Sequence, residues 1–311
     1  MLCQQPRDYN DKPPRLPNTE QSHKPHRMSY WINKAALVTG GSAGLGLAIA
    51  RELVRCGARV AIAGRDQQRL EDAVKSLCFE LTNGSPAAGS DKTRELPAAV
   101  GIAADVTRQE QVASLVEQTV LTFDRLDLLV NCAGKSTRGA VAAVTPEEYR
   151  ELWELNFLAQ VHCARACLPH LLKTKGHVVN VGSLAAKTAS PFLSAYSASK
   201  FPVAAFSQQL RLELSQQGLH VLLVCPGPIR RDDAGIRYEQ ATGDVPQSAR
   251  LPGAGVKLKG IDPDWLSRRI LLACERRRAE LVVPAKARLL FAIAQLWPSL
   301  GDWIVRRMTG T

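Results

Sequence analysis

The sequence predicts a doubly wound α/β domain, in which a mostly parallel β-sheet is covered by helices on both faces. Short apolar runs without polar alternation are typical of strands that are buried on both faces. Each run is followed by a segment with apolar residues at helical spacing, and such pairs alternate from residue 35 to residue 228. Apolar amino acids make up 45% of the 311 residues, which is enough for a substantial core.

Each element has its own local signals. The first strand is AALVTGG, residues 35–41, and the first helix, residues 43–57, ends at a glycine typical of helix C-termini. The later strands are expected at residues 58–65, 99–106, 126–134, 177–183 and 219–228. The later helices are expected at residues 66–81, 108–123, 145–173 and 194–218. Asp66 can cap the first of these later helices, and Thr145 as N-cap with Pro146 in the first turn begins the third.

Composition divides the chain into three parts. Residues 1–30 are polar and rich in Pro and Gln, so we predict a disordered N-terminal tail. Residues 31–284 form the predicted α/β domain, and residues 285–311 form an amphipathic helical extension. Two polar segments that contain Gly and Pro, residues 82–98 and 232–260, are predicted loops within the domain.

A glycine-rich turn, TGGSAGLG from Thr39 to Gly46, joins the first strand to the first helix. Free N–H groups at a helix start point at a ligand, and the helix dipole favours negative charge there. Glycine also lets the backbone approach a pyrophosphate closely. Tight turns use glycine too, but the position at the first strand–helix junction favours a phosphate site.

Six motifs in a fixed order resemble the short-chain dehydrogenase/reductase family. YSASK, a Tyr four residues before a Lys, means little alone, but here it follows Ser183 by thirteen positions, the usual interval of the family. The other matching motifs are TGxxxGxG at Thr39–Gly46, Asp105–Val106, NCAG at Asn131–Gly134 where the family usually has NNAG, Asn156, and PGPI at Pro226–Ile229. The resemblance covers about residues 33–229 and implies a Rossmann-type dinucleotide-binding catalytic domain.

The resemblance implies both a catalytic set and a cofactor site. The implied catalytic residues are Asn156, Ser183, Tyr196 and Lys200. The implied cofactor-binding residues are Thr39, Gly40, Ser42, Gly44, Leu45, Gly46, Arg65, Asp105, Val106, Asn131, Ala133, Gly134, Tyr196, Lys200, Pro226, Gly227 and Ile229. By the same resemblance Ser183 would bond the substrate oxygen, and Asn156 would position a water that passes protons to Lys200. Ser183 could instead only cap a turn, and Asn156 could only pack locally.

The chemistry of Tyr196 and Lys200 fits a proton transfer coupled to hydride transfer. A carbinol that loses hydride needs a base, a carbonyl that gains it needs an acid, and tyrosine can serve as both. The ordinary pKa of tyrosine is about 10, and a nearby positive charge favours the phenolate and lowers that pKa. Lys200 is one helical turn after Tyr196, so both side chains project from the same helix face.

The end of the second strand bears on the choice of cofactor. NAD enzymes place an acid there for the ribose 2′-hydroxyl, whereas NADP enzymes place an Arg near the 2′-phosphate. This chain has Gly64 in place of the acid, and Arg65 follows it. Asp66 argues mildly against a phosphate, but it can equally cap the next helix. We therefore expect NADP(H) rather than NAD(H), and we expect no metal, because no CxxC motif or His/Cys spacing suits zinc.

The sequence leaves two function classes open. The first is an oxidoreductase that moves hydride between NADP(H) and a carbonyl or secondary alcohol, with an apolar substrate by family analogy. The alternative is a catalytically silent protein that senses NADP(H) or binds membranes on the same fold. Position 231 departs from the family, which usually has Thr there to contact the nicotinamide carboxamide, so Arg231 receives no cofactor role. Residues 232–260 would form the substrate lid.

The C-terminal region is basic and apolar at once. Of the net charge of +11, more than half arises from residues 257–311, which suggests an anionic partner or simply a solvated basic face. Residues 286–308 mix aromatic and aliphatic residues with flanking Lys and Arg, which predicts peripheral membrane contact, a subunit interface, a cover over the substrate cleft or packing on the domain. Scattered cysteines and the lack of an apolar N-terminal run predict a cytoplasmic protein. We expect a homo-oligomer, and no nucleic-acid partner.

Overall fold

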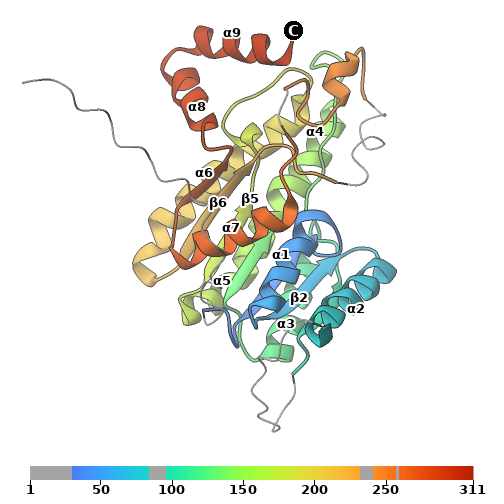
Figure 1. The fold of residues 1–311 in the computed structure, drawn as a ribbon, viewed down its shortest axis with the longest axis vertical. Coiled ribbons are helices and arrows are strands. Elements are labelled where there is room, and N and C mark those ends of the chain that lie inside the picture. The colour runs from blue at the N-terminus through green and yellow to red at the C-terminus, as the bar shows by residue number, and fades with distance from the viewer. Residues whose placement is uncertain (1–29, 84–95, 232–240, 257–258, 311) are drawn as a thin grey trace, which may run out of the picture.

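A seven-stranded, fully parallel sheet forms the centre of the molecule (Figure 1). The computed structural model describes residues 30–83, 96–231, 241–256 and 259–310. The strand order is β3-β2-β1-β4-β5-β6-β7, and the chain reverses its direction of winding between β1 and β4. The strands are β1 (Ala35–Thr39), β2 (Arg59–Gly64), β3 (Ala99–Ala103), β4 (Leu128–Asn131), β5 (His177–Val181), β6 (His220–Pro226) and β7 (Glu280–Val283). The predicted doubly wound fold is therefore confirmed.

Helices cover both faces of the sheet, which explains the apolar strands. The helices are α1 (Gly44–Arg55), α2 (Gln67–Asn83), α3 (Gln109–Phe123), α4 (Pro146–Trp153), α5 (Ala159–Thr174), α6 (Ser194–Leu214), α7 (Pro263–Glu275), α8 (Ala287–Leu296) and α9 (Pro298–Thr309). In β1, Ala36 and Val38 pack with α1, α2 and α7, whereas Ala35 and Leu37 pack with α3, α5 and α6. All five residues of β1 are buried, so neither face has room for the polar residues of a half-exposed strand.

The local signals at two helix starts act as the sequence predicts. The Asp66 carboxylate accepts a hydrogen bond of 3.0 Å from the backbone N–H of Arg69, so it caps α2. Thr145 and Glu148 form a reciprocal capping box at α4, in which each side chain accepts from the backbone N–H of the other residue. These bonds satisfy N–H groups that have no partner within the helix.

The structure departs from the sequence prediction in two places. The expected continuous helix over residues 145–173 is interrupted, because Glu154–Leu158 forms a π-helical turn between α4 and α5. The sequence reading also ended at the sixth strand, whereas α7 and β7 add one more helix and one more strand to the sheet edge. Residues 1–29 of the predicted tail 1–30, most of the loop 82–98, and residues 232–240 and 257–258 of the predicted lid lie outside the described residues.

The C-terminal extension consists of α8 and α9, which pack against each other. Figure 1 shows both helices (red) at one end of the molecule, away from α2 and α3. Large apolar side chains are exposed on them: Leu289, Leu296, Trp297, Leu300, Trp303 and Met308. Within the described residues, every helix is too short or too polar to cross a bilayer.

Candidate active site

One cavity of about 910 Å³ lies at the carboxyl ends of the central strands and brings most of the predicted site residues together. The predicted residues that line it are Gly40, Ser42, Leu45, Gly46, Arg65, Asp105, Val106, Ala133, Gly134, Ser183, Tyr196, Lys200, Pro226, Gly227 and Ile229. Its lining includes seven basic side chains and only two acidic ones. Such an excess of positive charge attracts an anionic ligand. Doubly wound sheets bind ligands at this edge, where the winding reverses.

The glycine-rich turn leaves the start of α1 open. The N-cap residue is Ala43, which offers no side-chain hydrogen bond, and the first turn carries no acid. A Cβ on Gly46 would lie 2.2 Å from the carbonyl oxygen of Gly40, and a Cβ on Gly40 would lie 2.9 Å from Cα of Ala133. The close contacts therefore require glycine at both positions. Uncapped N–H groups at a helix start are a ready site for phosphate oxygens.

Thr39 and Asn131 lie beneath the cavity rather than in its wall, and both are buried. The Thr39 hydroxyl accepts hydrogen bonds of 3.1 and 3.2 Å from the backbone N–H groups of Cys132 and Ala133, so it fixes the turn after β4. Asn131 donates a hydrogen bond of 2.9 Å from Nδ2 to Oδ1 of Asn180 on β5. Their side chains shape the floor of the site, and Cys132 and Ala133 form the surface above them.

Ser183, Tyr196 and Lys200 all line the cavity. Ser183 follows β5, and its hydroxyl oxygen accepts a hydrogen bond of 3.1 Å from the backbone N–H of Ala185. The hydroxyl hydrogen can therefore point at a substrate oxygen. Tyr196 and Lys200 come from the first turns of α6. The structure thus brings together the three residues that the family motif predicts.

Lys200 is held in a buried position. Its Nζ donates a hydrogen bond of 3.0 Å to the carbonyl oxygen of Val181, the last residue of β5. Burial lowers the pKa of Lys200 to about 8, because an ammonium group loses its hydration there. Gly134 makes room for this arrangement, since a Cβ on it would lie 2.8 Å from Oδ1 of Asn156 and 3.5 Å from Nζ of Lys200.

Asn156 lies in the π-helical turn and does not line the cavity. Its amide Oδ1 accepts from the backbone N–H of Lys135, and its Nδ2 donates to the Lys135 carbonyl oxygen, both at 2.9 Å. Nδ2 also donates to Oγ of Ser199, which in turn donates to the carbonyl oxygen of Tyr196. Asn156 therefore ties the turn after β4 to the start of α6, which carries Tyr196 and Lys200. Short π-helical turns are often found at functional sites.

Ser199 and Gln160 are polar residues around this site that the sequence analysis did not single out. Both are buried, and Gln160 Nε2 donates a hydrogen bond of 2.9 Å to the Asn156 carbonyl oxygen. The only sequence signal for Ser199 is its place inside YSASK, next to the lysine. A signal for Gln160 is its spacing of four residues from Asn156, which puts both on one helix face.

The far end of the cavity carries Arg65 and Arg69, which lie after β2 and in the first turn of α2. Asp105, which follows β3, lines the same cavity close enough to Arg65 to feel its charge. Burial acts to raise the pKa of Asp105, but hydrogen bonds from Thr107 and the nearby charge of Arg65 outweigh it and hold the pKa below its usual value. Asp66 is engaged as the cap of α2 and pairs with Arg69.

Arg231 occupies a place that the sequence analysis left without a role. It lines the cavity, and its Nη1 lies 3.3 Å from where a Cβ on Gly44 would be. A guanidinium group therefore faces the glycine-rich turn at the start of α1. The family usually has a threonine hydroxyl at this position, so the chain replaces a neutral group with a cation. The sequence shows an arginine at this position, but the direction of its side chain depends on the course of the backbone after Ile229.

The C-terminal helices close one side of the cavity. Apolar side chains from α8 and α9 line it: Leu290, Phe291, Ile293, Ile304, Val305 and Met308. Pro252, Gly253 and Val256 come from the segment after β6 and also line the cavity. The buried Arg138 holds that segment through a hydrogen bond of 2.9 Å to the carbonyl oxygen of Ala249. The extension thus contributes an apolar wall to the site.

The fold and the site define an oxidoreductase of the doubly wound α/β class. A family model described as short chain dehydrogenase matches residues 34–240. The chain therefore belongs to the short-chain dehydrogenase/reductase family, whose members use a nicotinamide cofactor.

Relatives match most of the chain. It is 30% identical to dehydrogenase/reductase SDR family member 7B of Danio rerio over 270 residues, which cover 86% of this chain and 83% of the relative. L-fucose dehydrogenase of Bos taurus is 35% identical over 200 residues, or 64% of this chain and 67% of the relative. A short-chain dehydrogenase structure from Streptomyces avermitilis superimposes with a TM-score of 0.70 at 28% identity, covering 87% of this chain and 96% of the other.

Proposed function

We propose that the protein is an NADP(H)-dependent reductase or dehydrogenase that interconverts a carbonyl and a secondary alcohol on an apolar substrate. The observation that carries the proposal is the shared cavity. Ser183, Tyr196 and Lys200 line the same space as the glycine-rich turn at the start of α1. A bound dinucleotide and a substrate oxygen would therefore meet at these three side chains.

The residues present fit a dinucleotide. Gly44, Leu45 and Gly46 begin α1, whose N-cap Ala43 makes no side-chain hydrogen bond, so their N–H groups suit the oxygens of a pyrophosphate. Arg231 would add a cation at the same place. The buried ammonium of Lys200 would bond the ribose hydroxyls next to the nicotinamide.

When it is bound, the nicotinamide ring supplies or accepts the hydride. The Ser183 hydroxyl would donate a hydrogen bond to the substrate oxygen and hold it against Tyr196. The Tyr196 hydroxyl would give its proton to that oxygen during reduction and take it back during oxidation. The ammonium of Lys200 would favour the phenolate of Tyr196. Asn156 would act through its neighbours, because its hydrogen bonds fix the backbone of Lys135 and, through Ser199, the carbonyl of Tyr196.

The preference for NADP(H) rests on the end of β2. Gly64 offers no carboxylate to a ribose 2′-hydroxyl, and Asp66 is engaged at the start of α2. Arg65 and Arg69 line the adjoining part of the cavity. A planar guanidinium group binds a phosphate through two parallel hydrogen bonds, which suits Arg65 to a 2′-phosphate.

The wall formed by α8 and α9 favours an apolar substrate. Leu290, Phe291 and Ile304 could not satisfy the hydroxyl groups of a sugar such as the one named for the relative from Bos taurus. Buried hydroxyls without partners cost free energy, so the wall selects against them.

The decisive experiment incubates the purified chain with NADPH and a panel of ketones, aldehydes and quinones. Oxidation of NADPH at 340 nm with an apolar carbonyl supports the proposal, and L-fucose with NADP or NAD is the polar control. Tight binding of NADPH without turnover of any panel member would instead support the silent, cofactor-sensing alternative.

We also propose that α8 and α9 contact a membrane peripherally. Leu296, Trp297 and Trp303 are all more than half exposed, and the basic side chains of Arg306 and Arg307 belong to the same helices. Tryptophan favours the headgroup region of a bilayer, and cations favour anionic lipids. A homo-oligomer that covers the same apolar side chains is the competing arrangement.

A further inference from the structure

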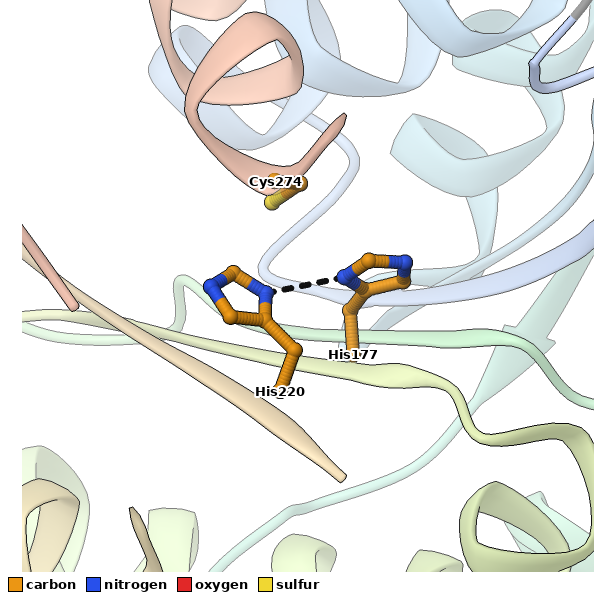
Figure 2. A group of neighbouring side chains, drawn as sticks. All are labelled: His177, His220 and Cys274. Carbon is orange, nitrogen blue, oxygen red and sulfur yellow. Dashed lines mark hydrogen bonds between the residues drawn. The ribbon is translucent and has the colours of Figure 1, made fainter. Parts of the chain in front are cut away.

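We propose that His177, His220 and Cys274 form a buried binding site for a thiophilic metal ion, Zn²⁺ or Cu⁺, which is separate from the catalytic cavity. Figure 2 shows the three side chains, with the thiol of Cys274 facing the edge where the two imidazole rings meet. One nitrogen from each ring and the Sγ atom all lie within 4.8 Å of one another. All three residues are buried.

Rigid elements hold the three ligands. His177 and His220 are the first residues of β5 and β6, and they are partners in the parallel pairing of these strands. Cys274 lies in the last turn of α7, which packs on the same sheet face. The cluster is at the amino ends of the strands, whereas Ser183 and Gly227 follow their carboxyl ends. The metal would therefore have a structural role and would not take part in hydride transfer.

The hydrogen bonds of the rings point their Nδ1 atoms at each other. Nε2 of His220 lies 2.8 Å from the carbonyl oxygen of Arg278, and a carbonyl only accepts, so this nitrogen carries a proton. In the neutral ring, Nδ1 of His220 then carries no proton and can only accept a hydrogen bond or bind a metal through its lone pair. It lies 2.8 Å from Nδ1 of His177, so a proton or a metal ion must lie between the two nitrogens. When no metal is bound, Nδ1 of His177 carries the proton and donates it in a hydrogen bond to Nδ1 of His220. A metal ion that binds both nitrogens can replace this proton.

Tyr30 makes the replacement feasible. Its hydroxyl lies 2.6 Å from Nε2 of His177 and can either donate or accept. Without metal it donates to Nε2, and with metal it accepts from it, because the His177 proton moves from Nδ1 to Nε2. The Cys274 thiol loses its proton to solvent, so each bound ion releases one proton and no oxidant or reductant is needed. Outer hydrogen bonds that fix the second nitrogen of a histidine are typical of metal ligands.

The donor set selects the class of metal. Two imidazole nitrogens and one thiolate suit Zn²⁺ and Cu⁺, whereas Mg²⁺ and Ca²⁺ prefer oxygen. Zn–N and Zn–S bonds of roughly 2.0 and 2.3 Å require donor atoms about 3.3–3.7 Å apart. The two Nδ1 atoms, 2.8 Å apart, must therefore separate by about half an ångström, and the sulfur, within 4.8 Å of the nitrogens, must approach them by up to about one ångström.

The test uses the full chain after removal of metal under reducing conditions. Zn²⁺ and Cu⁺ are titrated separately against a chromophoric chelator, and Co²⁺ is added as a spectroscopic probe. We expect one ion per chain, a thiolate-to-Co²⁺ charge-transfer band, and an upward shift of the unfolding midpoint by several degrees with the bound metal. The competition with the chelator gives the affinity of the protein for each metal, and the two affinities show which ion the site prefers.

Cys274→Ala should abolish all three signals. Cys167→Ala is the matched control, because Cys167 is equally buried but lies on α5, on the other face of the sheet, and it should retain them. His220→Gln, whose amide can still donate to Arg278, is a second ligand variant. Failure of the wild type to bind any of the ions, or binding that survives Cys274→Ala, overturns the proposal.

Discussion

Nζ of Lys200 lies 3.0 Å from the carbonyl oxygen of Val181, so the end of β5 holds the lysine that the sequence pairs with Tyr196. The same strand end leads to Ser183 two residues later. One anchor therefore fixes the lysine relative to the residue that would bind the substrate oxygen. This anchoring buries the ammonium group of Lys200, which destabilises the charged form and lowers the pKa of Lys200 to about 8.

We expect Lys200→Met to stabilise the cofactor-free protein at neutral pH. A pKa lowered from 10.5 to about 8 corresponds to about 3 kcal/mol of destabilisation, and loss of the bond to Val181 offsets about 1 kcal/mol of the gain. The destabilisation is complete below pH 8, where the folded and unfolded chains are both charged. It disappears as the pH rises to 10.5, because both are then neutral.

Urea unfolding of wild type and Lys200→Met at pH 7 and pH 10 measures the difference. The advantage of the variant should be about 2 kcal/mol at pH 7 and should shrink toward zero or below at pH 10. An equal or lower stability of the variant at pH 7 would mean that the ammonium group is well solvated.

Tyr196→Phe should keep the fold and cofactor binding and lose most turnover. The change removes only the hydroxyl group that exchanges a proton with the substrate oxygen, and general acid–base catalysis contributes about 10²–10⁴-fold. Turnover with the best panel substrate and NADPH affinity are measured together, and Tyr149→Phe on α4 is the control. Retention of turnover within a few-fold would rule out the acid–base role.

Arg65→Ala should weaken NADPH binding by roughly tenfold or more and leave NADH binding nearly unchanged. The charge-assisted hydrogen bonds to the 2′-phosphate are each worth about 1.5–3 kcal/mol, and NADH lacks that phosphate. Titration calorimetry with both cofactors gives the two affinities. Arg231→Ala is the contrast, because it faces the glycine-rich turn and should weaken both cofactors alike. An equal loss of both with Arg65→Ala would remove the basis for an NADP(H) preference.

Gly134→Ala should disrupt the proposed active site around Asn156 and Lys200, although it adds only one methyl group. That Cβ would lie 2.8 Å from Oδ1 of Asn156, so the amide must shift and release the backbone of Lys135. We expect a loss of about 1–3 kcal/mol in unfolding free energy and a large loss of turnover. Gly260→Ala, where the nearest atom is 3.4 Å from the Cβ, is the control. Wild-type turnover in Gly134→Ala would contradict the tight packing.

Double substitution of Leu296 and Trp303 by Ser should reduce flotation with anionic vesicles. Both side chains are more than half exposed, so the substitutions remove apolar surface and leave the cavity wall intact. Leu121→Ser with Leu212→Ser is the matched control, because these exposed leucines lie on α3 and α6. High salt should weaken binding through the basic residues. Absence of binding by the wild type, or equal binding by both double variants, would refute the membrane contact.

Local sequence patterns determined the doubly wound architecture. Apolar runs such as AALVT at β1 are continuous because helices cover both faces of the sheet. A continuous apolar run therefore predicts a sheet between two layers of helices. The sequence also predicted the capping by Asp66 and Thr145, because each cap bonds a backbone N–H only three residues further along the chain. The spacing from Ser183 through Tyr196 to Lys200 pointed to one site, and the structure brings the three residues to one cavity.

Only the tertiary structure decided what depends on contacts between distant segments. The π-helical turn at Asn156 accompanies its bonds to Lys135, 21 residues away, and helix periodicity carries no signal for that contact. The guanidinium of Arg231 meets the turn at Gly44, and the α8–α9 wall meets the same cavity, through chain directions that sequence spacing does not encode. His177, His220 and Cys274 likewise lack any motif spacing, because strand pairing and the packing of α7 bring them together.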